Sequence, residues 1–335
     1  TIQIEGSTNS PRTHLFLSRH GYRQRSDWQS MKQVQQQELD PKEIMDMAIK
    51  QHSLNKLYVL FSGGKDSVCV LHFIATNYPD IFGGAVFTNT GLGSQETRKF
   101  VINYCKEMGW KLYMTYPQEN EIFQKIMLKN GFATAGSHRI WMGYLKFHTW
   151  YYFSKWRKKE LNEKMAFISG VRKKESTQRA KIKAYTRKPI DVNATMIFIK
   201  PFLYKNGVEL WDYFLENNLK KTPVYDWLNR SGECYCGAFT QTGDLKLMQK
   251  YDPLAFETIR RYEKLIQKNG TEIAKKNSKW GEQNQATDDI INQTVLDNFV
   301  KTDEDYCGES CMIYGDDPKK FNDEFEDIEA KLEMV

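Results

Sequence analysis

The chain has 335 residues and a mass of 39.4 kDa, with 40% apolar and 27% charged side chains, a balance typical of globular proteins. This length and composition exclude collagen, a disulfide miniprotein and a wholly disordered chain. Because no apolar run approaches the ~18 residues of a membrane helix and no secretory signal is recognisable, we expect a cytoplasmic protein without membrane contact.

The formal net charge of +6 hides an uneven distribution of charge. Residues 303–335 hold twelve Asp and Glu against three lysines, whereas residues 155–188 hold thirteen Lys and Arg against three Glu. Such a basic segment would attract nucleotides, phosphates or nucleic acid. A solvated helix surface can have the same composition, so charge alone leaves both interpretations open.

The first half of the chain alternates between predicted strands and helices. Polar residues 1–40 predict an arm, which continues into a helix with a proline near its start at 39–52. Short apolar runs then predict buried strands, and apolar residues at helical intervals predict a helix between each two strands. The strands are 56–62, 84–90 and 111–117, and the helices between them are 67–78 and 96–109. This alternation is typical of a parallel sheet with right-handed crossovers.

The second half continues the pattern with longer irregular parts. Two more strands are predicted, with a basic segment between them, followed by helices and a polar linker. The predicted order is helix 139–164, strand 165–171, basic segment 172–188, strand 196–202, helix 208–218, helix 244–269 and linker 270–290. We therefore predict an α/β fold with a doubly wound, mostly parallel sheet and helical N- and C-terminal additions. The domain boundaries that we expect are 1–50, 51–245 and 246–335.

The most informative motif joins the first strand to its helix. It consists of Ser62, Gly63, Gly64, Lys65, Asp66 and Ser67. The glycines let the backbone turn and approach a ligand closely, and the amides at the start of the helix form an anion site. Lys65 adds positive charge, the serines add hydroxyls, and Asp66 could hold Mg²⁺ or make a structural hydrogen bond. The spacing differs from that of a Walker loop.

These residues and four further motifs resemble a known family. SGGKDS is similar to the PP-loop of the ATP pyrophosphatase superfamily, in particular its phosphoadenosine phosphosulfate (PAPS) reductase-like branch. The other matching segments are 88–97, with Asn89 where the family usually has Asp, 170–179, 201–213 and 223–236. The five motifs stand in the family's order and cover about residues 55–245.

The resemblance implies an adenine nucleotide alpha hydrolase-like fold whose loop binds the phosphates of ATP, or the phosphosulfate of a sulfonucleotide. An arginine fork across the phosphates would stabilise the charge that develops during attack on the α-phosphate. The catalytic residues implied are Lys65, Asp66, Arg172 and Arg179. The nucleotide-binding residues implied are Phe61, Ser62, Gly63, Gly64, Lys65, Asp66, Ser67, Thr88, Thr90, Gly91 and Gly170, with Phe61 and Thr88 framing the adenosine.

Four cysteines form two close pairs, Cys234 with Cys236 and Cys307 with Cys311. In a reducing compartment, four such thiolates could hold a [4Fe–4S] cluster or a zinc ion, or they could remain free thiols or a redox pair. Members of the resembled branch often carry a four-iron cluster. Their further ligands lie in a segment that corresponds here to residues 139–146, which contain no cysteine.

Two further cysteines and one histidine are also candidates for a functional or a packing role. Cys69 and Cys105 lie in helical sequence with apolar neighbours, which predicts buried packing. His138, next to Arg139, lies in a segment that faces the substrate in the resembled family, and it is a further candidate for that reason.

The implied reaction is attack on the α-phosphate of ATP, with Mg²⁺ as cofactor, to give an adenylated intermediate and pyrophosphate. The basic body and the absence of reductase motifs make the chain look like the ATP pyrophosphatases of DNA phosphorothioation systems (Dnd and Ssp type). That likeness implies DNA and a cysteine desulfurase as partners. Two alternatives stay open: a sulfonucleotide reductase with Cys307 or Cys311 as nucleophile, and a non-catalytic nucleotide-sensing scaffold.

Overall fold

The computed structural model describes residues 38–117, 122–175, 179, 181–191 and 194–281. The chain divides into two units, Thr1–Leu39 and Asp40–Val335, and the fold below is that of the second unit. The predicted arm, the acidic segment 303–335, Cys307 and Cys311 lie outside the described residues. Within them, no helix is both long enough and apolar enough to span a membrane.

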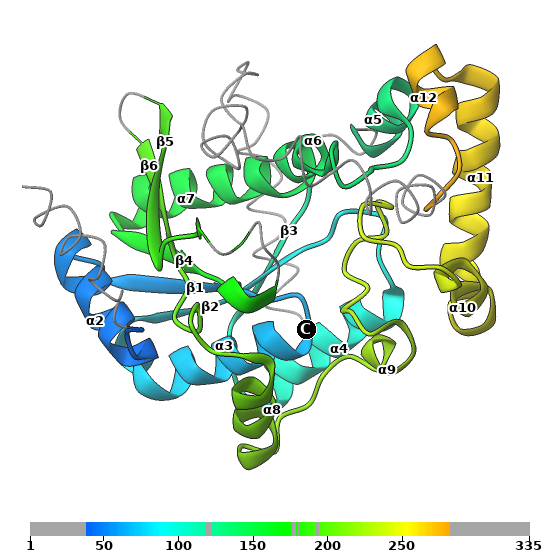
Figure 1. Ribbon diagram of the computed structural model, residues 1–335. Coiled ribbons are helices and arrows are strands. Elements are labelled where there is room, and N and C mark those ends of the chain that lie inside the picture. Colours follow the sequence, from blue (N-terminus) through cyan, green and yellow to red (C-terminus); the bar gives the residue numbers. More distant parts are fainter. Residues whose placement is uncertain (1–37, 118–121, 176–178, 180, 192–193, 282–335) are drawn as a thin grey trace, which may run out of the picture. The chain divides into compact units, whose positions relative to one another are not determined.

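A six-stranded sheet with the order β3-β2-β1-β4-β6-β5 forms the centre of this unit (Figure 1). The strands are β1 Lys56–Leu60, β2 Phe82–Thr88, β3 Leu112–Thr115, β4 Met165–Ile168, β5 Tyr185–Asp191 and β6 Ala194–Ile199. All neighbouring pairs are parallel except β5 with β6. The predicted α/β class with a mostly parallel sheet is therefore confirmed. The chain moves outward from β1 in one direction and then returns to its other side, so β1 and β4 form a topological switch point.

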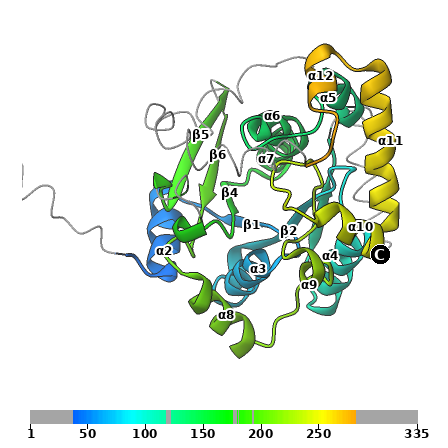
Figure 2. The same ribbon diagram turned by 45° about the vertical axis from the view of Figure 1, so that its right-hand side comes forward.

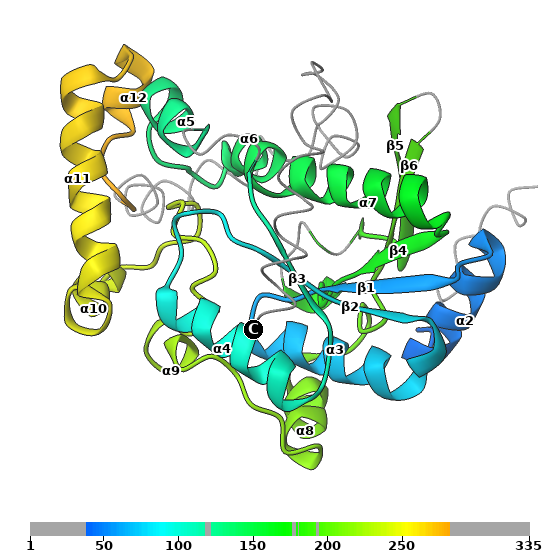
Figure 3. The ribbon, with the colours of Figure 1, turned by 180° about the vertical axis from the view of Figure 1, so that it is seen from behind.

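Helices cover both faces of the sheet, as Figures 1 and 3 show. On one side lie α3 Lys65–Asn77, α4 Gln95–Glu107 and α8 Gly207–Glu216, and on the other lies α7 His148–Leu161. Helix α7 is preceded in the chain by a short helix, α6 His138–Met142, and by a π-helical turn, Gly143–Phe147. The amino-terminal helix α2 Pro41–His52 begins with a capping box between Asp40 and Glu43.

A second apolar core joins the carboxyl-terminal helices to the sheet domain. Its helices are α5 Ile122–Asn130, α9 Val224–Leu228, α10 Asp244–Tyr251, α11 Pro253–Asn269 and α12 Glu272–Lys276. Trp141, Phe132 and Trp280 are buried among them, and Figure 2 shows α10, α11 and α12 grouped beside α5. The Trp280 indole donates to the carbonyl of Tyr235 at 2.8 Å, which ties the end of this helical group to the loop that carries Cys234 and Cys236.

The structure corrects three details of the predicted elements. The basic segment 172–188 runs into β5, an edge strand whose position tolerates charged side chains and Pro189. The helix predicted over 244–269 is two helices, because Asp252 ends α10 and caps α11, whose first residue is Pro253. The predicted linker 270–290 contains α12, which Thr271 caps.

A buried ion pair fastens α7 to the sheet. Arg157 binds Glu163 through two nitrogens, Nε at 3.0 Å and Nη2 at 2.7 Å, and Tyr58 of β1 donates to the same carboxylate at 2.8 Å. The Arg157 guanidinium also lies over the rings of Tyr113 and Trp156. Both charged groups are thus fully partnered, which is the condition under which a buried ion pair is tolerated.

Candidate functional site

The SGGKDS loop lies where β1 ends and α3 begins, as predicted. Gly63 has φ +76°, a left-handed conformation that favours glycine, and its carbonyl accepts from Thr222 N at 2.9 Å. The Ser67 hydroxyl donates to the carbonyl of Gly64 at 2.8 Å and lies 3.1 Å from the hydroxyl of Ser62. Gly64 is the N-cap of α3, and no side chain caps this helix. The amides of its first turn are therefore available to an anion.

Asp66 is the centre of a charge cluster beside the loop. Arg172 contacts its Oδ2 through both Nε and Nη2, each at 2.9 Å, and Lys65 Nζ lies 2.7 Å from its Oδ1. Gly170 packs against the Asp66 backbone so closely that an added Cβ would lie 2.8 Å from the Asp66 carbonyl oxygen. The structure thus brings together four residues that the sequence pointed to, and the Arg172 guanidinium is positioned by the Asp66 carboxylate.

Lys65 has an unusual environment for a lysine. Its side chain is 4% exposed, and its ammonium makes no well-aligned hydrogen bond, because the Asp66 oxygen is close but not well oriented for one. The ring of Trp211, on α8, lies under the ammonium with 5.0 Å from Nζ to the ring centroid. A cation over an aromatic face is attracted by the ring quadrupole. No sequence motif points to Trp211, since only packing of α8 against α3 brings it to the loop.

The loop at 231–236 is fixed against the phosphate loop by hydrogen bonds. Thr97 of α4 donates to the carbonyl of Ser231, and its hydroxyl lies 3.0 Å from that of Thr222. Tyr235 N donates to Leu92 O at 2.6 Å. A Cβ added to Gly64 would lie 3.2 Å from Ser231, so these two loops are in direct contact. The loop that carries Cys234 and Cys236 therefore lies next to the phosphate loop and forms one side of the candidate site.

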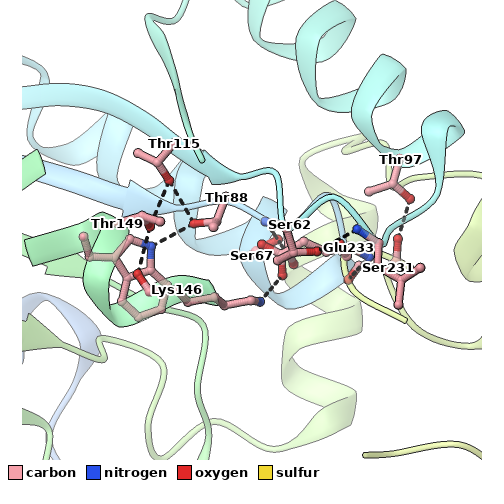
Figure 4. A network of polar contacts seen from close by, with 12 residues as sticks. Ser62, Ser67, Thr88, Thr97, Thr115, Lys146, Thr149, Ser231 and Glu233 are labelled. Carbon is pink, nitrogen blue, oxygen red and sulfur yellow. Dashed lines mark hydrogen bonds and ion pairs between the residues drawn. The ribbon is translucent and has the colours of Figure 1, made fainter. Parts of the chain in front are cut away.

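Thr88 and Thr90, expected to face the nucleotide, are both buried. The Thr88 hydroxyl accepts from Trp150 Nε1 at 2.9 Å and lies 3.1 Å from that of Thr115, as Figure 4 shows for the two threonines. The Thr90 hydroxyl donates to the carbonyl of Glu233. Their side chains thus hold the carboxyl ends of the strands in place. Phe61 is buried as well, whereas Gly91, with φ +78°, has open space around it.

A second charged pair lies on the opposite side of the loop at 231–236. Lys146 reaches from the π-helical turn to Glu233, with 2.5 Å between Nζ and Oε2 (Figure 4). Burial, the largest single effect, lowers the pKa of Lys146, but the charge and hydrogen bond of Glu233 together with the charges of Cys234 and Cys236 raise that pKa above its usual value. Lys146 is therefore a permanent cation at the site. The sequence offered one signal for Lys146, because it ends the segment 139–146 that corresponds to a cysteine-bearing segment of the resembled branch.

The two thiols at 234 and 236 differ in acidity. A hydrogen bond from Cys236, followed by the charge of Lys146, lowers the pKa of Cys234 to about 7, although burial opposes the change. The same hydrogen bond and burial raise the pKa of Cys236 well above its usual range. Cys234 is consequently the more ionised thiol near neutral pH. Cys69 and Cys105 are buried, as predicted, and burial raises the pKa of each to about 12.

Arg179 and His138 lie near the Lys146 side of the site. Burial first, and then the charges of Lys146 and Arg179, lower the pKa of His138 to about 4, so His138 is neutral at pH 7. Its ring packs against Phe239 with 4.6 Å between ring centroids. A neutral imidazole in this position can donate or accept a hydrogen bond but adds no charge to the site.

The described residues provide a limited set of metal ligands. No three His, Cys, Asp or Glu side chains within them come together in a way that could hold a metal ion. Cys234 and Cys236 supply two thiols, and the other two predicted ligands, Cys307 and Cys311, lie outside. Both oxygens of Asp66 already contact cations, so the described part of the chain does not form a Mg²⁺ site without the oxygens of a bound phosphate.

A protein-family model matches more than half of the chain. A family model described as the phosphoadenosine phosphosulfate reductase domain matches residues 56–250. None of the curated proteins compared with the chain is similar enough in sequence to count as a relative.

Three solved structures are among those similar to this chain. Phosphoadenylyl-sulfate reductase from Candida auris, a phosphate complex, has 17% identity and a TM-score of 0.40, covering 61% of this chain and 91% of its own. FMN adenylyltransferase from Candida glabrata, with FMN and an ATP analogue, has 15% identity and a TM-score of 0.38, covering 56% and 59%. Yeast FAD synthetase with FAD has 17% identity and a TM-score of 0.30, covering 51% and 53%.

Proposed function

The chain belongs to the phosphoadenosine phosphosulfate reductase domain family, and from this premise we propose that it is an ATP pyrophosphatase that adenylates its substrate. The observation that carries the proposal is the uncapped N-terminus of α3 beside the Asp66–Arg172 pair. An uncapped helix start and a guanidinium that a carboxylate holds in place together suit an oligophosphate, because they supply amide donors and fixed positive charge.

In the proposed reaction an oxyanion of the substrate attacks the α-phosphorus of ATP. A bond forms between that oxygen and phosphorus, the bond to the β-phosphate bridge oxygen breaks, and pyrophosphate leaves with the electron pair. The α3 amides and Lys65 hold the leaving phosphates, and Arg172 stabilises the charge on the equatorial oxygens. Mg²⁺ would enter with the nucleotide and neutralise phosphate charge, with Asp66 as the nearest carboxylate.

The substrate that we propose is a DNA backbone phosphate, activated for replacement of an oxygen by sulfur from a cysteine desulfurase. The basic residues 155–188 contain Arg172 and run into the edge strand β5, and such a concentration of positive charge attracts a polyanion. Cys234, ionised near neutral pH and beside Lys146, is suited to attack the sulfane sulfur of the desulfurase's cysteine persulfide, whose cysteine leaves as a thiolate. The resulting Cys234 persulfide would attack the activated phosphorus and expel AMP. Attack of the Cys236 thiol on Cys234 would then release the phosphorothioate and leave a Cys234–Cys236 disulfide, which a thiol reductant would reduce. An iron–sulfur cluster on Cys234, Cys236, Cys307 and Cys311 remains the alternative use of these thiols.

The test is release of pyrophosphate from Mg²⁺-ATP with and without DNA. Lys65→Met keeps the length of the buried side chain and removes its charge, and Lys106→Met is the matched control on the exposed face of α4. We expect Lys65→Met to lose at least tenfold in turnover, since one lost charge contact to a phosphate in the transition state costs about 2–4 kcal/mol. Equal rates in the two variants would contradict the mechanism.

The same preparation distinguishes the reductase alternative. Production of sulfite from a sulfonucleotide in the presence of a thiol reductant, lost in Cys307→Ser, with no pyrophosphate from ATP under any condition, would replace the proposed reaction by a reduction. ATP binding without turnover, with DNA and a desulfurase both present, would favour the scaffold.

A further inference from the structure

An open groove runs along α11, in a part of the unit that the proposed reaction does not use. Its volume is about 470 Å³, and its lining consists of Arg260, Glu263, Lys264, Gln267, Lys268 and Lys279. Five of these residues recur at three- and four-residue intervals, so they form one stripe on the helix. Figures 1 and 2 show α11 as the long helix next to α10 and α12.

The one carboxylate in the lining is already neutralised. Glu263 is 6% exposed, its Oε2 accepts from Arg260, and its Oε1 accepts from Trp280 N at 3.0 Å. It therefore serves the local fold and is not free to pair with the lysines. Lys264, Lys268 and Lys279 are exposed, and no described carboxylate pairs with any of them. The groove thus has uncompensated positive charge.

The basic segment 155–188 is less available, because many of its cations have partners. Arg157 binds Glu163, Lys159 contacts Glu160, and Arg172 binds Asp66. The α11 groove combines a concave shape with exposed ammonium groups that no described carboxylate neutralises. A chain of carboxylates or phosphates is able to contact several of these lysines at once.

We propose that the acidic segment 303–335 of the same chain binds in this groove. The described residues end at Gly281, two positions after Lys279, so the groove lies beside the point where the rest of the chain departs. Residues 282–302 can span at most about 70 Å, which is ample for return to α11. Twelve Asp and Glu against three lysines give the segment a net charge of −9, which is opposite in sign to that of the groove.

Because the acidic segment and the groove belong to the same chain, weak contacts between them are sufficient for binding. Each exposed ion pair contributes little, so the isolated segment would bind poorly. Attachment through a short linker gives an effective concentration of about 1 mM, so an intrinsic Kd of about 0.1 mM would keep the groove about 90% occupied. Because the contacts are exposed, binding should weaken strongly as salt shortens the Debye length to about 3 Å at 1 M.

Zero-length carbodiimide cross-linking of the full chain at low concentration, read by mass spectrometry, tests the proposal. We expect cross-links between the groove lysines and carboxylates of 303–335. The triple variant K264Q/K268Q/K279Q should lose these cross-links. The matched control K42Q/K50Q/K106Q removes three exposed lysines from α2 and α4 and should keep them. Tail cross-links spread equally over both sets of lysines, or absent from the groove, would overturn the proposal.

Cross-linking a mixture of ¹⁴N- and ¹⁵N-labelled chains distinguishes contacts within one chain from contacts between chains. Cross-links that join the two isotopes would show binding between chains and would also overturn the proposal.

A second readout uses fluorescein-labelled heparin. Neutralising the densest acidic cluster of the segment, as D323N/E324Q/E326Q/D327N/E329Q, should raise heparin affinity about tenfold by freeing the groove. The rise should vanish when the triple lysine variant is added. If an oligonucleotide binds the groove equally well with and without these acidic residues, the groove is a nucleic-acid site and the proposal is wrong.

Discussion

Gly170 offers the sharpest test of how the phosphate loop is built. It follows β4, two residues before Arg172, and it packs against the backbone of Asp66. A Cβ added there would lie 2.8 Å from the Asp66 carbonyl oxygen and 2.9 Å from its carbonyl carbon. Both partners are backbone atoms, so no side-chain rotation can relieve the contact.

The size of the expected effect follows from that distance. Ordinary contact begins at 3.4 Å, so in Gly170→Ala either the loop or the strand end must move by about 0.6 Å, at a cost of about 1–3 kcal/mol in overpacking. The protein should therefore stay folded. Arg172 is held to Asp66 by the same contact between the phosphate loop and the end of β4. We therefore expect the rate of pyrophosphate release to fall by about tenfold to hundredfold, because misplacing catalytic groups by about 1 Å can slow a reaction by about a hundredfold.

The assay is ATP titration calorimetry together with pyrophosphate release, with thermal unfolding measured in parallel. Gly207→Ala is the matched control, because nothing lies within 4 Å of a Cβ at that position at the start of α8. A Gly170→Ala protein that binds and turns over ATP within about twofold of the control, at an unchanged melting temperature, would refute the steric reasoning.

Three further predictions follow from the same structure. Trp211→Leu should raise the KM for ATP about fivefold by removing the ring beneath the Lys65 ammonium, whereas Trp211→Phe should restore most of it. Alkylation of Cys234 should rise with pH through a midpoint of about 7, and Lys146→Met should move that midpoint upward, which labelling rates read by mass spectrometry would show. Glu163→Gln should lower the free energy of unfolding by about 3–5 kcal/mol in denaturant titrations, because it breaks a buried ion pair; a loss below about 1 kcal/mol would contradict this.

Local sequence was sufficient for the α/β class, for the mostly parallel sheet and for the phosphate loop. Each part of this loop has a short-range cause. A short apolar run forms the strand, the left-handed φ of Gly63 favours a glycine in the turn, and no side chain caps the first turn of the helix that follows. The edge strand β5 was not predicted, because its residues are charged and include Pro189. Only its place at the end of the sheet, with one neighbour, makes such a strand stable.

The remaining site residues depended on tertiary structure. Lys146 and Glu233 are 87 positions apart, and Trp211 is 146 positions from Lys65, so no periodicity in the sequence relates them. They meet because the parallel strands end at one edge and the helices of both layers converge there. The sequence by itself pointed to the phosphate loop, Arg172 and the cysteine pair at 234 and 236. Packing decided that Asp66 holds Arg172 and that Trp211 covers Lys65, because side chains distant in sequence meet only when the core is formed.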